Sequence, residues 1–302
     1  MPNSRYLHIT HGNRQNRGKR KTLQSQPASI GIHLLIAFFF MSLPWKSAFA
    51  NMPFHNPIPG GIAVIYLADK SSTKPSVKFG NKEILVLKDN KKWVAVIGLS
   101  REILPGNYLI NIELEDRSKV SQLFRVDPIP SSMPGRIIEL PEALLDMKFE
   151  PVKLSHLLAN DQTYPFSGPK AVVPVFKMQQ IVSKGQYVPY GLIIKKGKNT
   201  ELIDHSWITY ITDTESVVAS PGDGVVEHMG QLDDKAIYVV LHHGMGMRSI
   251  ISNLKYTSLK VGDTIKSKAP LGITAGSVKG RVDWQLIINQ NKVDPLQFSP
   301  SS

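Results

Sequence analysis

The sequence predicts an all-β protein made of an immunoglobulin-like sandwich and a second β-sheet core, joined by a short helical connector. Short apolar or alternating runs, separated by turn residues, fill residues 60–127. Similar runs follow residue 164 and continue to the C-terminal end. The length of 302 residues is sufficient for two modest domains, each with its own core.

Residues 1–50 have the order of a secretory signal peptide. A basic stretch that includes Arg14 and Lys21 precedes a largely apolar run from Ile30 to Leu43, and an A-x-A sequence ends at Ala50. The run is shorter than the roughly 20 residues that cross a bilayer. We therefore expect an exported protein of the periplasm or cell envelope of a bacterium. Membrane contact is expected only if the leader stays uncleaved.

Composition limits the chemistry of the remaining chain. Seven of the 36 basic residues and none of the 24 acidic residues lie in the leader, which leaves a net charge of +5. This mild excess suits anionic cell-wall polymer, and no basic-aromatic array suggests nucleic acid. Cysteine is absent, so a metal site would have to use His, Asp or Glu.

The first domain is expected at residues 51–130. Its predicted strands are 62–67, 83–87, 93–99, 108–114 and 122–126, with turns at Gly80-Asn81, Asp89-Asn90 and Pro105-Gly106. This spacing favours a small immunoglobulin-like sandwich.

A Pro-rich and helical connector is expected at residues 131–165, with short helices at 141–147 and 153–159. The second domain then covers residues 166–302. Its predicted strands are 190–194, 207–211, 215–218, 224–228, 237–242, 248–251 and 284–288. We expect the connector to pack across the two domains or along the groove of the second.

Several separated segments of the second domain follow the order of a known family pattern. His205-Ser-Trp-Ile-Thr209 stands at H-x-G-x-D, the segment from His243 to Leu254 at H-G-x-G-x-x-T-x-Y-x-H-L, and Gly280-Arg-Val-Asp-Trp284 at G-x-H-x-H-[FW]. Further segments are 220–226, 261–263, 271–272 and 293–295. Over roughly residues 176–298 the chain resembles the lysostaphin/LytM family of zinc murein endopeptidases. Residues 60–61, 93–98 and 104–106 also resemble the β-sandwich that precedes the peptidase core in some members.

The resemblance assigns roles that this sequence does not fill. The family's three zinc ligands correspond to His205, Thr209 and Asp283, and its two other catalytic histidines correspond to Asn253 and Arg281. Threonine is a poor zinc ligand, arginine would repel a dication, and asparagine does not exchange protons near neutral pH. We therefore predict a degenerate site with no intact catalytic residue, no confident metal ligand and no cofactor.

The alignment is ungapped at Thr209 and Asn253, whereas another alignment would delete the segment that contains Arg281 and Asp283. Both alignments lead to the same prediction, because no histidine follows His243. We also expect His205 to be a histidine without metal, Arg281 and Asp283 to pair on one strand face, and Trp284 to fill a core position. The groove residues are thus His205, Thr209, Asn253, Arg281, Asp283 and Trp284.

The predicted function is non-catalytic: peptidoglycan binding, or regulation of a cell-wall hydrolase such as an amidase. The rival from another class is an active zinc endopeptidase that uses His205, Asp283 and a third donor such as Asp204 or Asp213. A third alternative is a purely structural protein of two β-sandwiches.

Overall fold

The computed structural model describes residues 52–68, 72–130, 137–140, 178–196, 200–232, 235–276 and 278–298. All of them belong to one compact unit, Phe49–Ser302. The leader and the two predicted helices at 141–147 and 153–159 lie outside these residues. The expected packing of these helices along the groove therefore stays a prediction. Within the described ranges, no helix has the length and apolar character that a membrane span requires.

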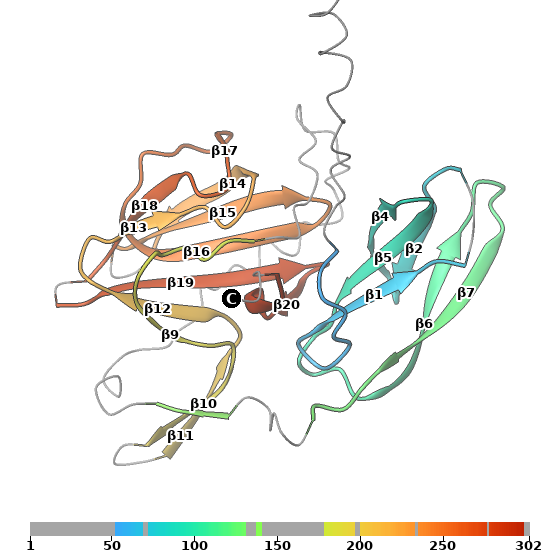
Figure 1. Ribbon diagram of the computed structural model, residues 1–302, viewed down its shortest axis with the longest axis horizontal. Helices are drawn as coiled ribbons and strands as arrows, with labels where there is room; N and C mark the ends of the chain where they lie inside the picture. The colour runs from blue at the N-terminus through green and yellow to red at the C-terminus, as the bar shows by residue number, and fades with distance from the viewer. Residues whose placement is uncertain are drawn as a thin grey trace, which may run out of the picture. The chain divides into compact units, whose positions relative to one another are not determined.

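The N-terminal strands form two antiparallel sheets (Figure 1). One sheet has the order β1 (Ile62–Tyr66), β5 (Lys92–Gly98), β4 (Leu85–Asp89). The other has the order β3 (Lys82–Glu83), β2 (Ser76–Phe79), β6 (Gly106–Glu113), β7 (Lys119–Val126).

Alternation along the strands determines which side chains become core. In β6, Ile110 and Ile112 are buried while their neighbours are exposed, because successive strand residues point to opposite faces. They join a cluster with Val77, Val86 and Ala95 from both sheets. Asn90, with φ 54°, makes the β4–β5 turn, as the Asp89-Asn90 signal predicted.

The side chain of Gln122 connects two edge strands of this sandwich. Its Nε2 donates to the carbonyl oxygen of Tyr66 at 2.9 Å, and its Oε1 accepts from the amide of Ala68 at 3.2 Å. Tyr66 ends β1, the edge of one sheet, and Gln122 lies in β7, the edge of the other. One amide side chain therefore satisfies a backbone acceptor and a backbone donor across the sandwich.

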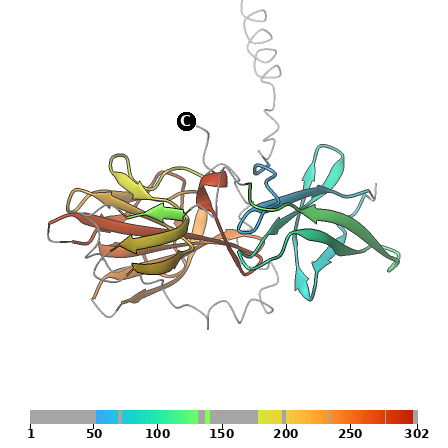
Figure 2. The same cartoon turned by 90° about the horizontal axis from the view of Figure 1, so that it is seen from below.

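The C-terminal part is a ten-stranded antiparallel sheet whose strands run side by side (Figure 1 and Figure 2). Its main path is β17 (Thr264–Ile265), β14 (Gly224–Gln231), β15 (Ile237–Gly244), β16 (Met247–Tyr256), β19 (Gly280–Ile288), β12 (Ile208–Thr212) and β9 (Gln186–Val188). The strands β13 (Val217–Ala219), β18 (Pro270–Thr274) and β20 (Asn291–Val293) pair beside this path, and a 3₁₀ turn, η2 (Pro295–Phe298), follows.

A third small sheet contains β11 (Thr200–His205), β10 (Gly191–Lys196) and β8 (Ile137–Glu139). β10 and β11 form a hairpin, and β8 joins β10 in parallel. The described part of the expected connector is thus a strand. Leu140, which follows β8, is buried with Trp207 and Ile211.

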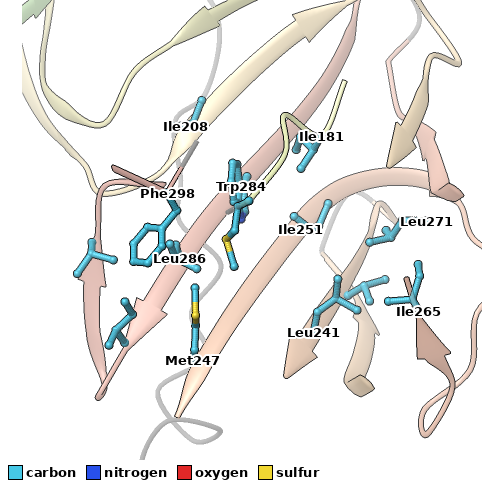
Figure 3. Packing of buried hydrophobic residues seen from close by; sticks show 14 of the residues in the cluster. Ile181, Ile208, Leu241, Met247, Ile251, Ile265, Leu271, Trp284, Leu286 and Phe298 are labelled. Atoms are coloured by element: carbon cyan, nitrogen blue, oxygen red, sulfur yellow. The ribbon is translucent and has the colours of Figure 1, made fainter. Parts of the chain in front are cut away.

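The main core lies on one face of the large sheet. Figure 3 shows the labelled side chains of Met247, Trp284, Leu286 and Phe298 gathered there. The same cluster includes Ile62 and Val96 of the N-terminal strands. In addition, Asn291 Nδ2 donates to the carbonyl oxygen of Gly98 at 2.6 Å. The main cluster therefore includes strands of both parts of the chain, beside the sandwich's own cluster, and the predicted all-β fold is confirmed.

Candidate functional site

Four strands bring five of the six predicted groove residues together. β11 ends at His205, β12 carries Thr209, β16 carries Asn253, and β19 carries Arg281 and Asp283. Strand register places Thr209 opposite Asp283, and Ser252 opposite Asp283 on its other side. Residues 205, 209, 253, 281 and 283 thus meet by strand pairing, whereas Trp284 points to the opposite, core face.

Four hydrogen bonds converge on the carboxylate of Asp283, which is only 5 % exposed. Thr209 Oγ1 donates to Oδ1 at 2.6 Å, and Asn253 Nδ2 donates to Oδ2 at 2.7 Å. Arg281 donates two more hydrogen bonds, from Nε to Oδ1 at 3.1 Å and from Nη2 to Oδ2 at 2.7 Å. This bidentate pair on one strand face confirms the expected pairing of Arg281 with Asp283.

His205 is fully buried, and each of its ring nitrogens lies beside a polar atom. Nδ1 lies 2.9 Å from the carbonyl oxygen of Pro189, and Nε2 lies 3.0 Å from Thr209 Oγ1. A carbonyl oxygen only accepts, so Nδ1 carries a proton and the neutral ring presents a lone pair at Nε2. Trp207 packs on the ring, with centroids 4.3 Å apart, and its Nε1 donates to Thr209 Oγ1 at 3.1 Å.

The hydroxyl of Thr209 has one proton and two acceptors. Asp283 Oδ1 lies at 2.6 Å and His205 Nε2 at 3.0 Å. Both acceptors compete for this proton, and the charged carboxylate holds it at the shorter distance. The Nε2 lone pair therefore faces a hydroxyl group.

Burial is the main cause of the electrostatic state of His205. Desolvation lowers its pKa to about 4, against smaller opposing effects from the Pro189 carbonyl and the Asp283 carboxylate. The Arg281 guanidinium lowers the pKa further by charge repulsion. The ring is therefore neutral at pH 7.

The atoms at the family's ligand positions do not fit zinc. Tetrahedral zinc with bonds of about 2.0 Å requires ligand atoms roughly 3.3 Å apart. Here Oγ1 of Thr209 is 2.6 Å from Asp283 Oδ1 and 3.0 Å from His205 Nε2, which are hydrogen-bond distances. Arg281 adds a fixed positive charge on the same carboxylate. The residues fill the ligand positions with a hydrogen-bonded network.

Both proposed third donors are largely exposed and interact with other groups. Asp204 is 61 % exposed and pairs with Arg101 at 2.6 Å. Asp213 is 93 % exposed and lies 3.9 Å from Lys279. Among the described residues, no group of three or more His, Cys, Asp or Glu side chains is placed to hold a metal ion.

His243 belongs to a separate structural network. Its Nδ1 donates to the carbonyl oxygen of Asp223 at 2.7 Å, and its Nε2 accepts from Ser249 Oγ at 2.8 Å. Ser249 in turn accepts from Trp284 Nε1 at 3.0 Å, so Trp284 fills the expected core position. Burial lowers the pKa of His243 to about 4.

His228 is only partly exposed and stacks on Tyr238, with ring centroids 5.6 Å apart.

Asn253 also accommodates an irregularity in the backbone of β16. It has φ 65° at a register shift of β16, a left-handed conformation that Asn adopts more readily than most residues. Its carbonyl oxygen accepts from Ala275, and its amide reaches Asp283. Asn253 therefore supports both the strand irregularity and the network.

Sequence reasoning missed Pro189 and Trp207 as partners of the site, and Ser249 as the partner of Trp284. Trp207 had a detectable signal, because it stands where the family pattern has glycine, and its indole now covers His205. Pro189 and Ser249 contribute one atom each through the fold, and no local pattern marks them.

The sheet and the position of the network define a peptidase-like β protein. Residues 55–128 match the peptidase family M23 N-terminal domain, and residues 204–295 match peptidase family M23. Together these models match just over half of the chain. The chain belongs to peptidase family M23, which confirms the lysostaphin/LytM resemblance, and members of this family act on peptidoglycan.

Several solved structures are similar to the chain, and the first of those named below shares its fold. A protein assigned to peptidase M23 from Pseudomonas aeruginosa is 21% identical, with a TM-score of 0.58 over 80% of this chain and 94% of that chain. The catalytic domain of the prophage-encoded M23 protein EnpA from Enterococcus faecalis is 17% identical, with a TM-score of 0.33 over 39% and 95%. The catalytic domain of lysostaphin from Staphylococcus simulans is 21% identical, with a TM-score of 0.29 over 38% and 89%. No curated protein matches the sequence.

Proposed function

We propose that this protein is a non-catalytic factor of the bacterial cell envelope that binds peptidoglycan or regulates a cell-wall hydrolase such as an amidase. The proposed domain organisation is a leader at 1–50, a sandwich at 51–130, a connector at 131–165 and a degenerate peptidase domain at 166–302. Export through the leader is part of the proposal. Family membership supports a location at the cell wall.

The network at Asp283 carries the proposal. Zinc peptidases need three ligands, an open position for water, and groups that transfer protons. Here the Asp283 carboxylate is satisfied by Thr209, Asn253 and Arg281. Loss of one proton-transfer group typically costs about 10²–10⁴-fold in rate, and both corresponding positions hold residues that do not transfer protons near pH 7.

Metal analysis and a zymogram test this proposal. Purified protein should contain far less than one zinc per chain after dialysis against zinc, and it should leave no lysis band on murein. An active M23 peptidase serves as the positive control in both assays. Stoichiometric zinc, together with lysis that His205→Ala abolishes, would establish the active endopeptidase instead.

Binding assays separate the non-catalytic role from a purely structural one. We expect the protein to co-sediment with isolated sacculi or to stimulate an amidase added to them. If it does neither, the structural protein of two β-sandwiches is the better description.

A further inference from the structure

Two edge strands of the sandwich, β1 and β7, differ in how their outward backbone groups are satisfied. Along the β1 edge, bonds come from the backbone of Asn56, the Nδ1 atom of His55 and the side chain of Gln122. A foreign strand could add to β1 only by displacing these bonds. They reach backbone groups of Ile62, Val64, Tyr66 and Ala68, the residues that alternate away from β5.

The β7 edge has no such protection. Among the described residues, β6 is the one strand that pairs with β7 (Figure 1). The Leu114 amide donates to the Ser118 oxygen at 3.0 Å where this hairpin turns, and bonded positions alternate along an antiparallel pair. Within the described part of the chain, no strand and no side chain bonds the backbone groups that point away from β6. These groups belong to Lys119, Ser121, Leu123 and Arg125.

Two leucine side chains face solvent beside the β7 edge. Leu123 of β7 is 60 % exposed, and Leu109 of β6, directly opposite in register, is 53 % exposed. Their neighbours Ile110 and Phe124 point to the other face and are buried in the sandwich. An open edge with exposed leucines offers both backbone bonds and apolar contact to another strand.

We infer that the β7 edge is a self-association surface, on which two copies of this chain pair their β7 strands antiparallel. Leu123 then lies opposite Leu123 of the partner subunit, on the two-fold axis between the copies. The leucines of four adjacent strands form one apolar stripe on the outer face, with Leu109 on each side of the central pair. This surface lies outside the groove, so the inference is independent of the proposed peptidoglycan binding.

Charge complementarity selects this register. Lys119 lies opposite Asp127 of the partner subunit, and Arg125 lies opposite the uncharged Ser121 of the partner subunit. Asp127 holds Arg125 of its own chain through Oδ1 at 3.0 Å, which leaves Oδ2 for the lysine. Opposite charges across a strand pair stabilise the pairing, and like charges destabilise it.

The neighbouring registers are less favourable. A slide of two residues in one direction would place Lys119 opposite Arg125 of the partner subunit, which sets like charges against each other twice. A slide of two residues in the other direction would place Leu123 opposite Arg125 of the partner subunit and separate the leucines. A slide of one residue would turn the leucines of one copy to the inner face of the shared sheet.

We expect this dimer to be in equilibrium with the monomer. A standard stable interface buries about 800 Å² on each partner, and one pair of edge strands covers less. A covalent trap at the two-fold axis is therefore the most sensitive test. The sequence contains no cysteine, so an introduced cysteine is the only thiol of each chain.

Cysteine trapping in cells that express the full chain tests the inference. In a hydrogen-bonded antiparallel pair the Cα atoms are about 5.5 Å apart, within the range that a disulfide spans. Leu123→Cys should therefore form a disulfide-linked dimer on mild oxidation with copper phenanthroline, seen on a non-reducing gel. Val261 of the other domain is 62 % exposed, and Val261→Cys is the matched control for random collision. We expect it to form at least about tenfold less dimer, because nothing holds its thiols together.

Two other cysteine positions test the register. Ser121→Cys and Arg125→Cys should each stay monomeric when expressed alone, because each would be roughly 13 Å from its own copy along the strands. When the two variants are expressed together, they should link to each other, since residues 121 and 125 lie opposite in the proposed register. A dimer of Ser121→Cys alone that matches the Leu123→Cys dimer in yield would refute this register.

Charge reversal tests the complementarity without touching the leucines of β6. In the Leu123→Cys background, Lys119→Glu alone or Asp127→Lys alone should lower the dimer yield at least about threefold, because like charges then face each other twice. The double variant Lys119→Glu/Asp127→Lys restores opposite charges and should recover the yield. Equal amounts of monomer in reduced samples control for expression.

Three results would overturn the inference. The first is a dimer yield of Leu123→Cys no higher than that of Val261→Cys. The second is a double charge variant whose yield stays as low as that of the single reversals. The third is a Leu123→Cys adduct whose mass differs from twice that of the chain, which would show that a different protein occupies the β7 edge.

Discussion

Arg281 places a permanent cation beside Asp283. A guanidinium group keeps its charge across the physiological pH range and fits a carboxylate through two parallel hydrogen bonds. Both contacts are present here, at 3.1 and 2.7 Å. The chain thus balances the buried charge of Asp283 with a side chain two residues away.

The buried histidines give stability a definite pH dependence. The pKa of His205 and that of His243 are each lowered to about 4, chiefly by desolvation. An unfolded histidine titrates near 6.5, so the unfolded chain binds more protons between pH 6.5 and 4. Stability is therefore complete above about pH 6.5 and decreases as the pH falls toward 4.

We expect the free energy of unfolding to fall by roughly 2 kcal/mol per histidine from pH 7 to pH 5, measured by urea denaturation. The His205→Gln variant should lose its share of this dependence. The charged groups that act on His205 in this range are Asp283, Arg281 and Asp204. An NMR titration that places the His205 ring near pH 6.5 in the folded protein would refute this explanation.

At the scale of the strands, local pattern predicted the longer elements. The expected strand at 237–242 corresponds to β15, which continues further at its C-terminal end. The expected strand at 248–251 corresponds to β16, which continues further at both ends. Short elements such as β9, β17 and β20 have two or three residues and were missed. Strands this short cannot show an alternation of polar and apolar residues. Pairing with neighbouring strands determines where they form.

The candidate site, like the strands, was predicted only in part from the sequence. Motif spacing predicted which residues meet, because strand register places Thr209 opposite Asp283. It did not reveal the contacts of Pro189 or Ser249, since these atoms arrive through loops and through the opposite face of the sheet. Hydrogen-bond partners of this kind depend on three-dimensional placement.

Close packing at the start of β19 gives a prediction for this element. A Cβ atom on Gly280 would overlap the backbone oxygen of Asp213 and the hydroxyl groups of Thr212 and Thr274. Gly280→Ala should therefore lower the free energy of unfolding by about 2 kcal/mol or more, because backbone must shift.

Gly222→Ala is the matched control for this change. A Cβ there would meet only His243 Nδ1 at 3.6 Å and two more distant atoms, an ordinary contact. We expect it to change the free energy of unfolding by less than about 1 kcal/mol. If Gly280→Ala lowers the free energy of unfolding no more than Gly222→Ala does, the crowding at Gly280 is relieved by local movement.

For the whole molecule, the sequence predicted a core in each domain, and the sandwich has a buried cluster of its own. The main cluster in addition joins Ile62 and Val96 to Trp284 and Leu286. Such contacts lie far apart in sequence, so alternation within strands does not reveal them. Asn291 adds a hydrogen bond to the carbonyl oxygen of Gly98. The two sets of strands are therefore energetically coupled.

Coupling of this kind predicts a single unfolding transition. In protein labelled with 5-fluorotryptophan, the ¹⁹F NMR signals of Trp93 and Trp284 should lose native intensity at the same urea concentration. Asn291→Ala should lower both midpoints together. Separate midpoints for Trp93 and Trp284 would mean that the two cores unfold independently.

Sheet proteins risk association through exposed strand edges, which offer backbone groups to another molecule. The Gln122 amide already occupies the Tyr66 oxygen and the Ala68 amide at one such border. A foreign strand would have to displace both bonds before it could add there. A single side chain thus helps to keep this border of the sandwich resistant to aggregation.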